Sequence, residues 1–318
     1  MKTLSAMKTL PLLTLCILLP ACNFRELVID KTVREQVQYV PDAAHFSGSE
    51  LTKLTDRVYT FRWTWDRNLV ILTDEGFVVT DPFNAQAAKA LKAELDRVAP
   101  GRPVRAMIYS HYHLDHTVGG AVLGAQEVIA HRKCPQYWSD LSDSPMTKDI
   151  VAPTRLIEGD QKLVIGGVEI ELLQLDRSHT DTLYAFYLPK EKILHTADVG
   201  LVRTIYPIGG PDMYMPGMIR EMQRLAKLDF DTWIPSHFAA GKKTDFVEAL
   251  EFATTTHNLA RDAWINLKYE VPADENKFAA SFHSIYDVLK AKYSHYRGFN
   301  EQSLFHVTRA FSGAVLGY

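Results

Sequence analysis

The chain has 318 residues, of which 47% are hydrophobic and 23% charged, and its formal net charge is −3. This composition is typical of a globular protein, and the chain is long enough for one large hydrophobic core or two. The sequence has no internal repeat and no long low-complexity run, which excludes a repeat protein. The net negative charge provides no positive electrostatic field of the kind that attracts nucleic acids, so we expect no nucleic-acid partner.

The N-terminus has the pattern of a targeting segment. Lys2 and Lys8 precede an apolar stretch, Leu10–Leu19, which is too short to span a bilayer as a stable helix. This stretch runs into the tetrapeptide LPAC, whose cysteine is Cys22. The arrangement resembles the lipobox of bacterial lipoproteins, which are cut before that cysteine and lipidated on its thiol. Met7 is an alternative start, because a lysine still precedes the apolar run.

We therefore expect a lipoprotein signal peptide over residues 1–21 and a polar tether over residues 22–50. Lipid on Cys22 would anchor the protein to the membrane in the bacterial periplasm, since each buried methylene adds about 0.8 kcal/mol. A plain secretory signal, which leaves a soluble periplasmic protein, is the alternative. With Cys16 removed in the signal and Cys22 lipidated, only the Cys134 thiol would remain free, so we expect no intramolecular disulfide and a structural thiol there.

From residue 57 onward, short strand patterns alternate with helical ones. The predicted strands are 57–63, 68–73, 76–80, 104–110, 127–130, 162–165, 168–175, 183–188, 192–195 and 232–235, and the predicted helices are 84–98 and 217–228. They form two similar halves, which predicts two packed sheets with helices outside. We therefore expect an α/β fold, a four-layer αββα sandwich, over residues 51–240.

Residues 241–318 are predicted to form a helical C-terminal extension. Apolar residues recur at helical spacing over 244–267, 277–293 and 301–311, without strand signals. This extension could cover a sheet edge, line a pocket or make a dimer contact. The sequence does not choose among these, and it leaves the oligomeric state open.

Two loops are candidates for contact with a substrate. Trp63 and Trp65 lie in the predicted hairpin tip 63–67, where they either pack into the core or form a flap over a pocket. Tyr206 lies in the glycine- and proline-rich segment 199–216, where a substrate contact and a purely structural role are both open.

A dense cluster of potential metal ligands lies between Ser110 and Thr117. The sequence there has the pattern HxHxDH, in which four metal-capable side chains fall within six residues: His111, His113, Asp115 and His116. Imidazole is the commonest metal ligand in proteins, and carboxylates suit the same divalent ions. The cluster follows a predicted buried strand, so it lies on a loop held by a rigid element. Such a loop can present ligands to two metal ions.

Three further candidate ligands follow later predicted strands. His179 comes after strand 168–175, Asp198 after strand 192–195, and His237 after strand 232–235. Because each follows the end of a strand directly, all three can converge on one edge of the sandwich.

This ordered set resembles the metallo-β-lactamase superfamily, in particular its glyoxalase II-like and lactonase-like branches. The resemblance covers roughly residues 57–240 and implies the αββα fold. It also implies that His111, His113 and His179 hold a first metal, that Asp115, His116 and His237 hold a second, and that Asp198 bridges both. Asp81 matches the aspartate that orders the ligand loop through hydrogen bonds.

Details of the ligand set narrow the branch. A bridging Asp198 departs from the β-lactamases that place cysteine on the second metal, which makes β-lactam hydrolysis less expected. His113 departs from the oxygen-reducing di-iron branch, which has a carboxylate at that position.

Two cations about 3.5–4 Å apart in such a site can share one water and lower its pKa towards neutrality. We therefore expect a hydrolase with two divalent metals, zinc by default with iron or manganese possible, that attacks an ester, lactone, thioester or amide-like bond, β-lactams included, of a small-molecule substrate. Asp198 would hold the metals at the reacting centre, and Asp115 could also receive a proton. Hydrolysis of phosphoesters or sulfate esters, and a non-catalytic envelope protein with structural metals, are the alternatives.

Overall fold

The computed structural model describes residues 42–267 and 275–316. The predicted signal peptide and most of the predicted tether lie outside these residues. Within them, the first β-strand, β1 (Ser49–Lys53), includes the last two residues of the expected tether. Phe46, also in the expected tether, is buried, and its ring packs against the ring of Phe238.

The first half of the domain forms a seven-stranded sheet in the order β1-β2-β3-β4-β5-β6-β7. Strands β1 to β4 are antiparallel neighbours, and β4 to β7 are parallel. After β1, its elements are β2 (Val58–Trp63), β3 (Asp66–Thr73), β4 (Gly76–Thr80), α2 (Ala85–Val98), β5 (Val104–Ile108), α3 (Leu114–Thr117), η3 (Gly120–Leu123), β6 (Glu127–His131), α4 (Cys134–Asp140), η4 (Pro145–Asp149) and β7 (Arg155–Ile157).

The second half forms a six-stranded sheet in the order β13-β12-β11-β10-β9-β8. Only β11 and β12 pair in parallel, and the other neighbours are antiparallel. Its elements are β8 (Gln161–Ile165), β9 (Val168–Gln174), β10 (Tyr184–Leu188), β11 (Ile193–Thr196), η5 (Pro207–Gly209), α5 (Met215–Leu225), β12 (Thr232–Pro235) and β13 (Gly241–Lys242).

Three apolar clusters hold these layers together. The central cluster joins the facing sides of the two sheets, for example Ile71 of β3 and Phe186 of β10. A second cluster lies between the outer face of the first sheet and α2, and a third lies between the outer face of the second sheet and α5. The layers are therefore helix, sheet, sheet and helix, which confirms the αββα sandwich.

Helix α2 illustrates how the sequence builds an outer layer. Asn84 caps it by accepting a hydrogen bond from the backbone of Ala87, and Leu91 and Leu95 lie four residues apart on its buried face. Burying each leucine stabilises the packing of helix on sheet by roughly 1.5–3 kcal/mol.

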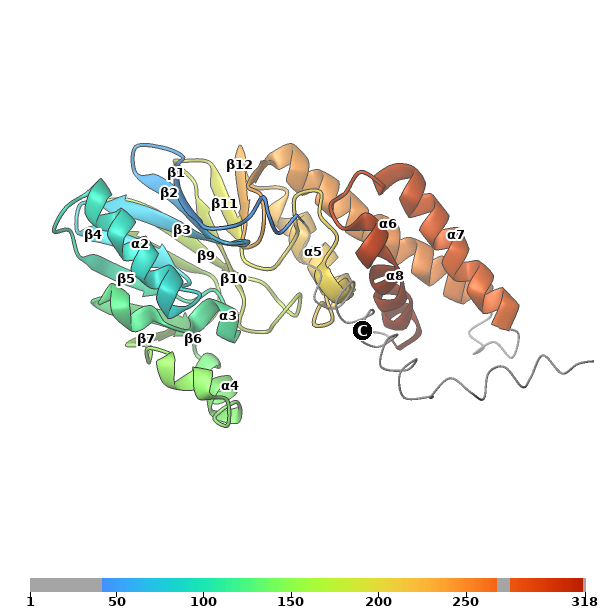
Figure 1. The fold of residues 1–318 in the computed structure, drawn as a ribbon, viewed down its shortest axis with the longest axis horizontal. Coiled ribbons are helices and arrows are strands. Elements are labelled where there is room, and N and C mark those ends of the chain that lie inside the picture. Colours follow the sequence, from blue (N-terminus) through green and yellow to red (C-terminus); the bar gives the residue numbers. More distant parts are fainter. Residues whose placement is uncertain (1–41, 268–274, 317–318) are drawn as a thin grey trace, which may run out of the picture. The chain divides into compact units, whose positions relative to one another are not determined.

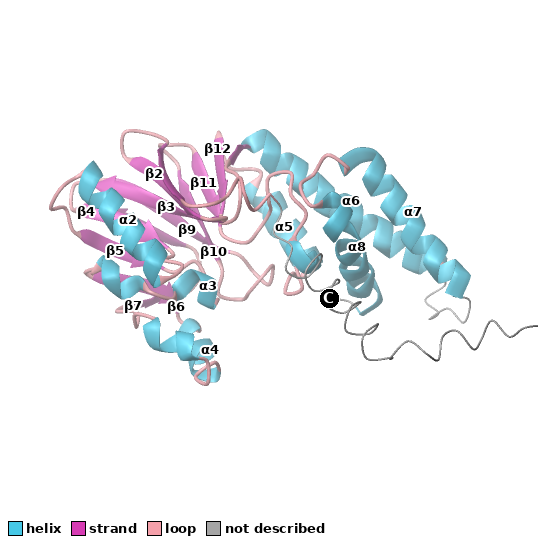
Figure 2. Ribbon diagram, viewed as in Figure 1, coloured by secondary structure: helices cyan, strands magenta, loops and turns pink. Residues whose placement is uncertain are grey.

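The helical extension is present as predicted. It consists of α6 (Lys243–Asn266), α7 (Glu275–Tyr293) and α8 (Phe299–Leu316), which lie side by side (Figure 1). They share an apolar cluster of their own, in which Phe252, Leu289 and Phe311 are buried. Figure 2 shows α6, α7 and α8 as helices, whereas the sandwich combines strands with helices such as α2 and α5. No helix within residues 42–267 and 275–316 is long and apolar enough to cross a membrane.

Candidate metal centre

The candidate ligands lie where strands of both sheets end. His111, His113, Asp115 and His116 follow β5, and His179 follows β9. Asp198 follows β11, and His237 follows β12. The structure brings all seven together as two adjoining groups, one of His111, His113, His179 and Asp198 and the other of Asp115, His116 and His237. The ligand atoms within each group lie within 4.8 Å of one another.

The Asp198 carboxylate connects the two groups. Its Oδ2 lies 3.3 Å from Nε2 of His111 and 3.0 Å from Nε2 of His179, both in the first group. The same oxygen lies 3.3 Å from Nε2 of His116, and Oδ1 lies 2.7 Å from Nε2 of His237. One carboxylate thus contacts histidines of both groups, which is the arrangement of a bridging ligand.

The outer nitrogens of the histidines are held by polar neighbours. Asp81 is fully buried; its Oδ1 accepts a hydrogen bond from the Ser110 backbone at 2.8 Å, and its Oδ2 lies 3.1 Å from Nδ1 of His116. The Ser110 hydroxyl lies 2.9 Å from Nδ1 of His111. Such contacts fix the tautomer of a histidine and direct its other nitrogen toward a metal.

Two carboxylates with the same role were not identified from the sequence. Asp66 Oδ1 lies 3.0 Å from Nδ1 of His237, although 171 residues separate the two in the chain. Asp212 Oδ2 lies 3.3 Å from Nδ1 of His179. Neither aspartate belongs to a recognisable local motif. The only signal available was that both lie in the two loops already considered for substrate contact.

The residues present fit divalent cations. Nε2 of His179 lies 3.3 Å from Nε2 of His111 and 3.0 Å from Nδ1 of His113, and it cannot donate one proton to both. Nε2 of His116 is buried without a hydrogen-bond partner. Lone pairs that converge in this way need a shared positive charge, and a donor set of nitrogen and oxygen suits zinc, iron or manganese.

The pKa shifts of the ligand side chains also indicate a site for cations. Burial alone would raise the pKa of Asp198, but the neighbouring His116, His237 and His179 outweigh it and hold that pKa well below its usual range. Burial opposes protonation of His237, yet Asp198 raises the pKa of His237 to about 10. Burial, followed by the charge of His179, lowers the pKa of His113 to about 4. Asp198 therefore requires positive charge beside it, which bound cations can supply in place of protons.

The hairpin between β2 and β3 holds the loop that carries His237. Arg67 donates its backbone N–H to the Ser236 carbonyl at 2.6 Å, and Trp65 accepts from the Phe238 backbone at 2.7 Å. The Trp63 indole is partly buried against the apolar cluster between the first sheet and α2, whereas Trp65 is 37% exposed. The hairpin therefore positions a ligand, and only Trp65 remains available for the flap role.

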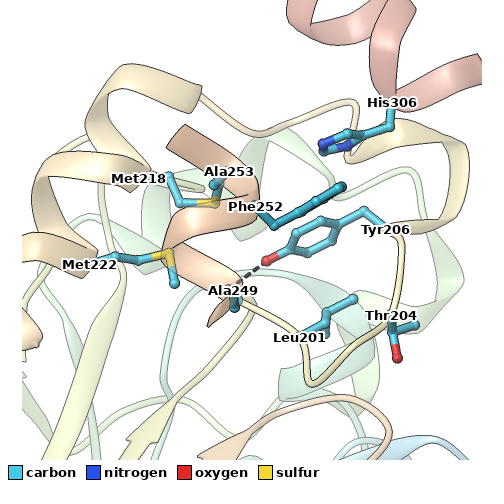
Figure 3. A pocket seen from close by; sticks show the side chains of 10 residues that line it. Leu201, Thr204, Tyr206, Met218, Met222, Ala249, Phe252, Ala253 and His306 are labelled. Carbon is cyan, nitrogen blue, oxygen red and sulfur yellow. Dashed lines mark hydrogen bonds between the residues drawn. The ribbon is translucent and has the colours of Figure 1, made fainter. Parts of the chain in front are cut away.

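Tyr206 faces the interior. Its hydroxyl accepts a hydrogen bond from the Gly200 backbone at 2.5 Å, inside a small apolar pocket with Met218. Figure 3 shows the Phe252 ring beside Tyr206 and the His306 imidazole next to Phe252; those last two rings stack at 4.9 Å. The structure favours the structural role for Tyr206. Cys134 is likewise buried, and burial raises the pKa of its thiol to about 12, as a structural cysteine requires.

Comparison with known proteins supports the assignment. The sequence model of the metallo-beta-lactamase superfamily matches residues 66–237. Over 211 residues the chain is 30% identical to the 2,4-dinitroanisole O-demethylase subunit alpha of Nocardioides sp. (strain JS1661), a match that covers 65% of this chain and 63% of that protein. The chain thus matches less than two thirds of that relative's length.

Solved structures share the fold at lower identity. A metallo-beta-lactamase from Pontibacter korlensis has a TM-score of 0.57 and 21% identity, over 65% of this chain and 99% of that one. The stereoselective inverting sec-alkylsulfatase Pisa1 from Pseudomonas sp. has a TM-score of 0.62 and 18% identity, over 86% of this chain and 50% of that one. The second match covers a larger share of the chain than residues 1–240 can supply, so it includes part of the helical extension.

The family model covers more than half of the chain and spans all seven ligands. The fold, the bridging carboxylate and this match together show that the chain belongs to the metallo-β-lactamase superfamily of metallohydrolases.

Proposed function

We propose that the protein is a dinuclear hydrolase that cleaves an ester, lactone, thioester or amide-like bond, β-lactams included, of a small molecule. The observation that carries the proposal is the Asp198 carboxylate, which contacts histidines of both ligand groups. When bound, two divalent cations supply a nucleophile derived from water near neutral pH and an electrophile for the scissile bond. Zinc is the proposed metal, and iron or manganese also suit the donor set.

The residues of the chain have distinct parts in this proposal. Asp198 is nearly buried and stays ionised, so it holds the two sites together. The Asp115 side chain is 60% exposed, and its Oδ2 lies 3.7 Å from Nε2 of His116. Asp115 can therefore exchange a proton between the centre and solvent.

Hydrolysis of sulfate or phosphate esters is the second candidate. It is favoured by the likeness to the sec-alkylsulfatase, which covers 86% of this chain and extends into the helical extension. The named activity of the curated relative adds an aryl methyl ether to the substrates worth testing, although the chain matches only 63% of that protein.

The test is a substrate panel with protein reconstituted with zinc, iron or manganese. We expect about two metal ions per chain and turnover of at least one carbonyl ester, lactone or thioester. Alkyl sulfates, phosphodiesters, a β-lactam and 2,4-dinitroanisole complete the panel. His113→Ala should abolish turnover, and full activity in this variant would contradict the proposal. Inactivity of the metal-loaded protein on every substrate would support the non-catalytic alternative.

We also propose that the protein is an exported lipoprotein anchored through Cys22. This segment lies outside the described residues, and the proposal is supported by the apolar run and the tetrapeptide LPAC in the sequence. Metabolic labelling with palmitate should mark the wild type but not Cys22→Ser. Equal labelling of both proteins, or none of either, would contradict the anchor.

A further inference from the structure

Beside the metal centre lies a cavity of about 250 Å³, whose wall includes Arg177, His179, Asp181, Asp212, Tyr214 and Arg309. It shares His179 with the centre: Nε2 of this imidazole lies 3.0 Å from Asp198, and Nδ1 lies 3.3 Å from Asp212. The cavity is therefore about one imidazole ring away from the reacting centre. Its volume suits one polar group of a substrate rather than a whole molecule.

Two guanidinium groups form the cationic part of the wall. Arg177 Cζ lies over the Tyr214 ring, 4.6 Å from its centre, so a cation–π contact helps to hold the guanidinium there. Arg309 comes from α8 and donates through Nη2 to the Met213 carbonyl at 2.6 Å. The two arginines reach the cavity from distant parts of the sequence: Arg177 follows β9, and Arg309 lies in the helical extension.

The two carboxylates in the wall already have partners. Asp181 pairs with the Lys133 ammonium at 2.7 Å and accepts a hydrogen bond from the Tyr137 hydroxyl at 2.8 Å. Asp212 faces the ligand His179. Arg177, by contrast, has no ion pair with any residue in the described part of the chain. The Arg177 guanidinium therefore leaves a positive charge available to a ligand, and guanidinium suits carboxylate, sulfonate and phosphonate groups through paired N–H donors.

We propose that this cavity is a subsite for an anionic substituent of the substrate, bound by Arg177 and Arg309. The proposal rests on the proposed hydrolase function and adds a substrate class to it: esters that carry a negative charge a few atoms from the scissile bond. It also gives the helical extension a part in substrate recognition.

The first test compares two esters of similar length on the metal-loaded enzyme. Mono-4-nitrophenyl succinate carries a carboxylate, and 4-nitrophenyl butyrate is its neutral counterpart. We expect Arg177→Gln and Arg309→Gln to raise KM for the succinate about tenfold or more and to change KM for the butyrate less than about twofold. Equal effects on both esters, or no effect on either, would overturn the proposal.

Arg220→Gln is the matched control, because Arg220 also lies against the Tyr214 ring, at 5.9 Å, but does not line the cavity. It should leave both KM values unchanged. Far-UV circular dichroism and the unfolding midpoint identify any variant that fails to fold. Arg177 is exposed on a loop, so its variant tests the subsite even if replacement of Arg309 disturbs α8.

A binding measurement separates failure of the subsite from failure of the hydrolase function. Calorimetric titration of the metal-loaded wild type should detect benzenesulfonate, phenylphosphonate or benzoate, with benzamide binding at least about tenfold more weakly. The anion that binds most tightly identifies the preferred chemistry. If neither ester is hydrolysed but Arg177→Gln weakens anion binding about tenfold, the function fails and the subsite stands. Unchanged anion affinity in both arginine variants would show that the metals alone hold the anion, which would overturn the subsite.

Discussion

The Asp66 side chain shows how one residue outside the ligand set can control the centre. Its carboxylate lies 3.0 Å from Nδ1 of His237. The hydrogen bond from the Arg67 backbone N–H to the Ser236 carbonyl holds the same loop independently of that side chain. Loss of the carboxylate should therefore change the orientation and basicity of the imidazole without unfolding the loop.

We expect Asp66→Asn to weaken the second metal site about 10- to 100-fold. Dialysis against a competing chelator, followed by metal analysis, should leave about one ion per chain in the variant under conditions that leave about two in the wild type. The control is Asp56→Asn, because the Asp56 side chain is fully exposed and pairs with Lys53, away from the metal centre. Metal retention equal to that of the wild type in Asp66→Asn would contradict a positioning role.

At the scale of elements, the ligand loop depends on a close approach of two segments. Gly119 lies three residues after His116, has φ +81°, and lies against the N-terminus of α2. A Cβ on this residue would lie 2.3 Å from the Ala85 backbone nitrogen and 2.4 Å from the Asn84 carbonyl carbon. Backbone atoms cannot yield to such a contact as a flexible side chain could, so glycine is required here.

Gly119→Ala should therefore lower the free energy of unfolding by at least about 2 kcal/mol, since steric overlap adds to backbone strain. Gly124→Ala is the matched control: Gly124 has φ +60° but open space around the position of its Cβ, so it should lose only about 1 kcal/mol. Urea unfolding measures the free energy of unfolding of both variants. Equal losses in the two variants would show that the close approach is unimportant.

At the scale of the whole molecule, the metals are expected to hold the two sheets together at one edge, because the ligands come from both. Chelation should lower the unfolding midpoint by several degrees and abolish activity, and added zinc should restore both. Binding to the folded state alone is worth about 2.7 kcal/mol at a free metal concentration 100 times Kd. An unchanged midpoint in protein proven to be metal-free would contradict this coupling.

His306 makes the stability of the molecule depend on pH. Burial lowers the pKa of this α8 residue to about 4, from an ordinary value of 6.5. Above pH 6.5 neither the folded nor the unfolded chain is protonated there, and the stability is fully present. Between pH 6.5 and 4 only the unfolded chain takes up the proton, so stability falls by up to about 3 kcal/mol as the pH falls.

His306→Phe keeps an aromatic ring packed against Phe252 and should remove this loss of stability at low pH. Relative to the wild type, the variant should gain unfolding free energy between pH 7 and pH 4 in urea titrations. His283→Asn, on an exposed position of α7, should leave the pH profile unchanged. The same pH slope in wild type and His306→Phe would show that His306 does not titrate on unfolding.

The sequence by itself determined the layers and the ligands of this protein. The strands and outer helices were predictable because hydrophobic periodicity is local. The ligands were predictable because His111 to His116 form a dense motif and the others follow strands in order. What the tertiary structure alone decided is the second set of contacts, namely Asp66 on His237, Asp212 on His179, and Arg309 beside Met213. These pairs lie 171, 33 and 96 residues apart. No local pattern encodes them, because they form only when loops and helices from distant parts of the chain pack at one edge of the sandwich.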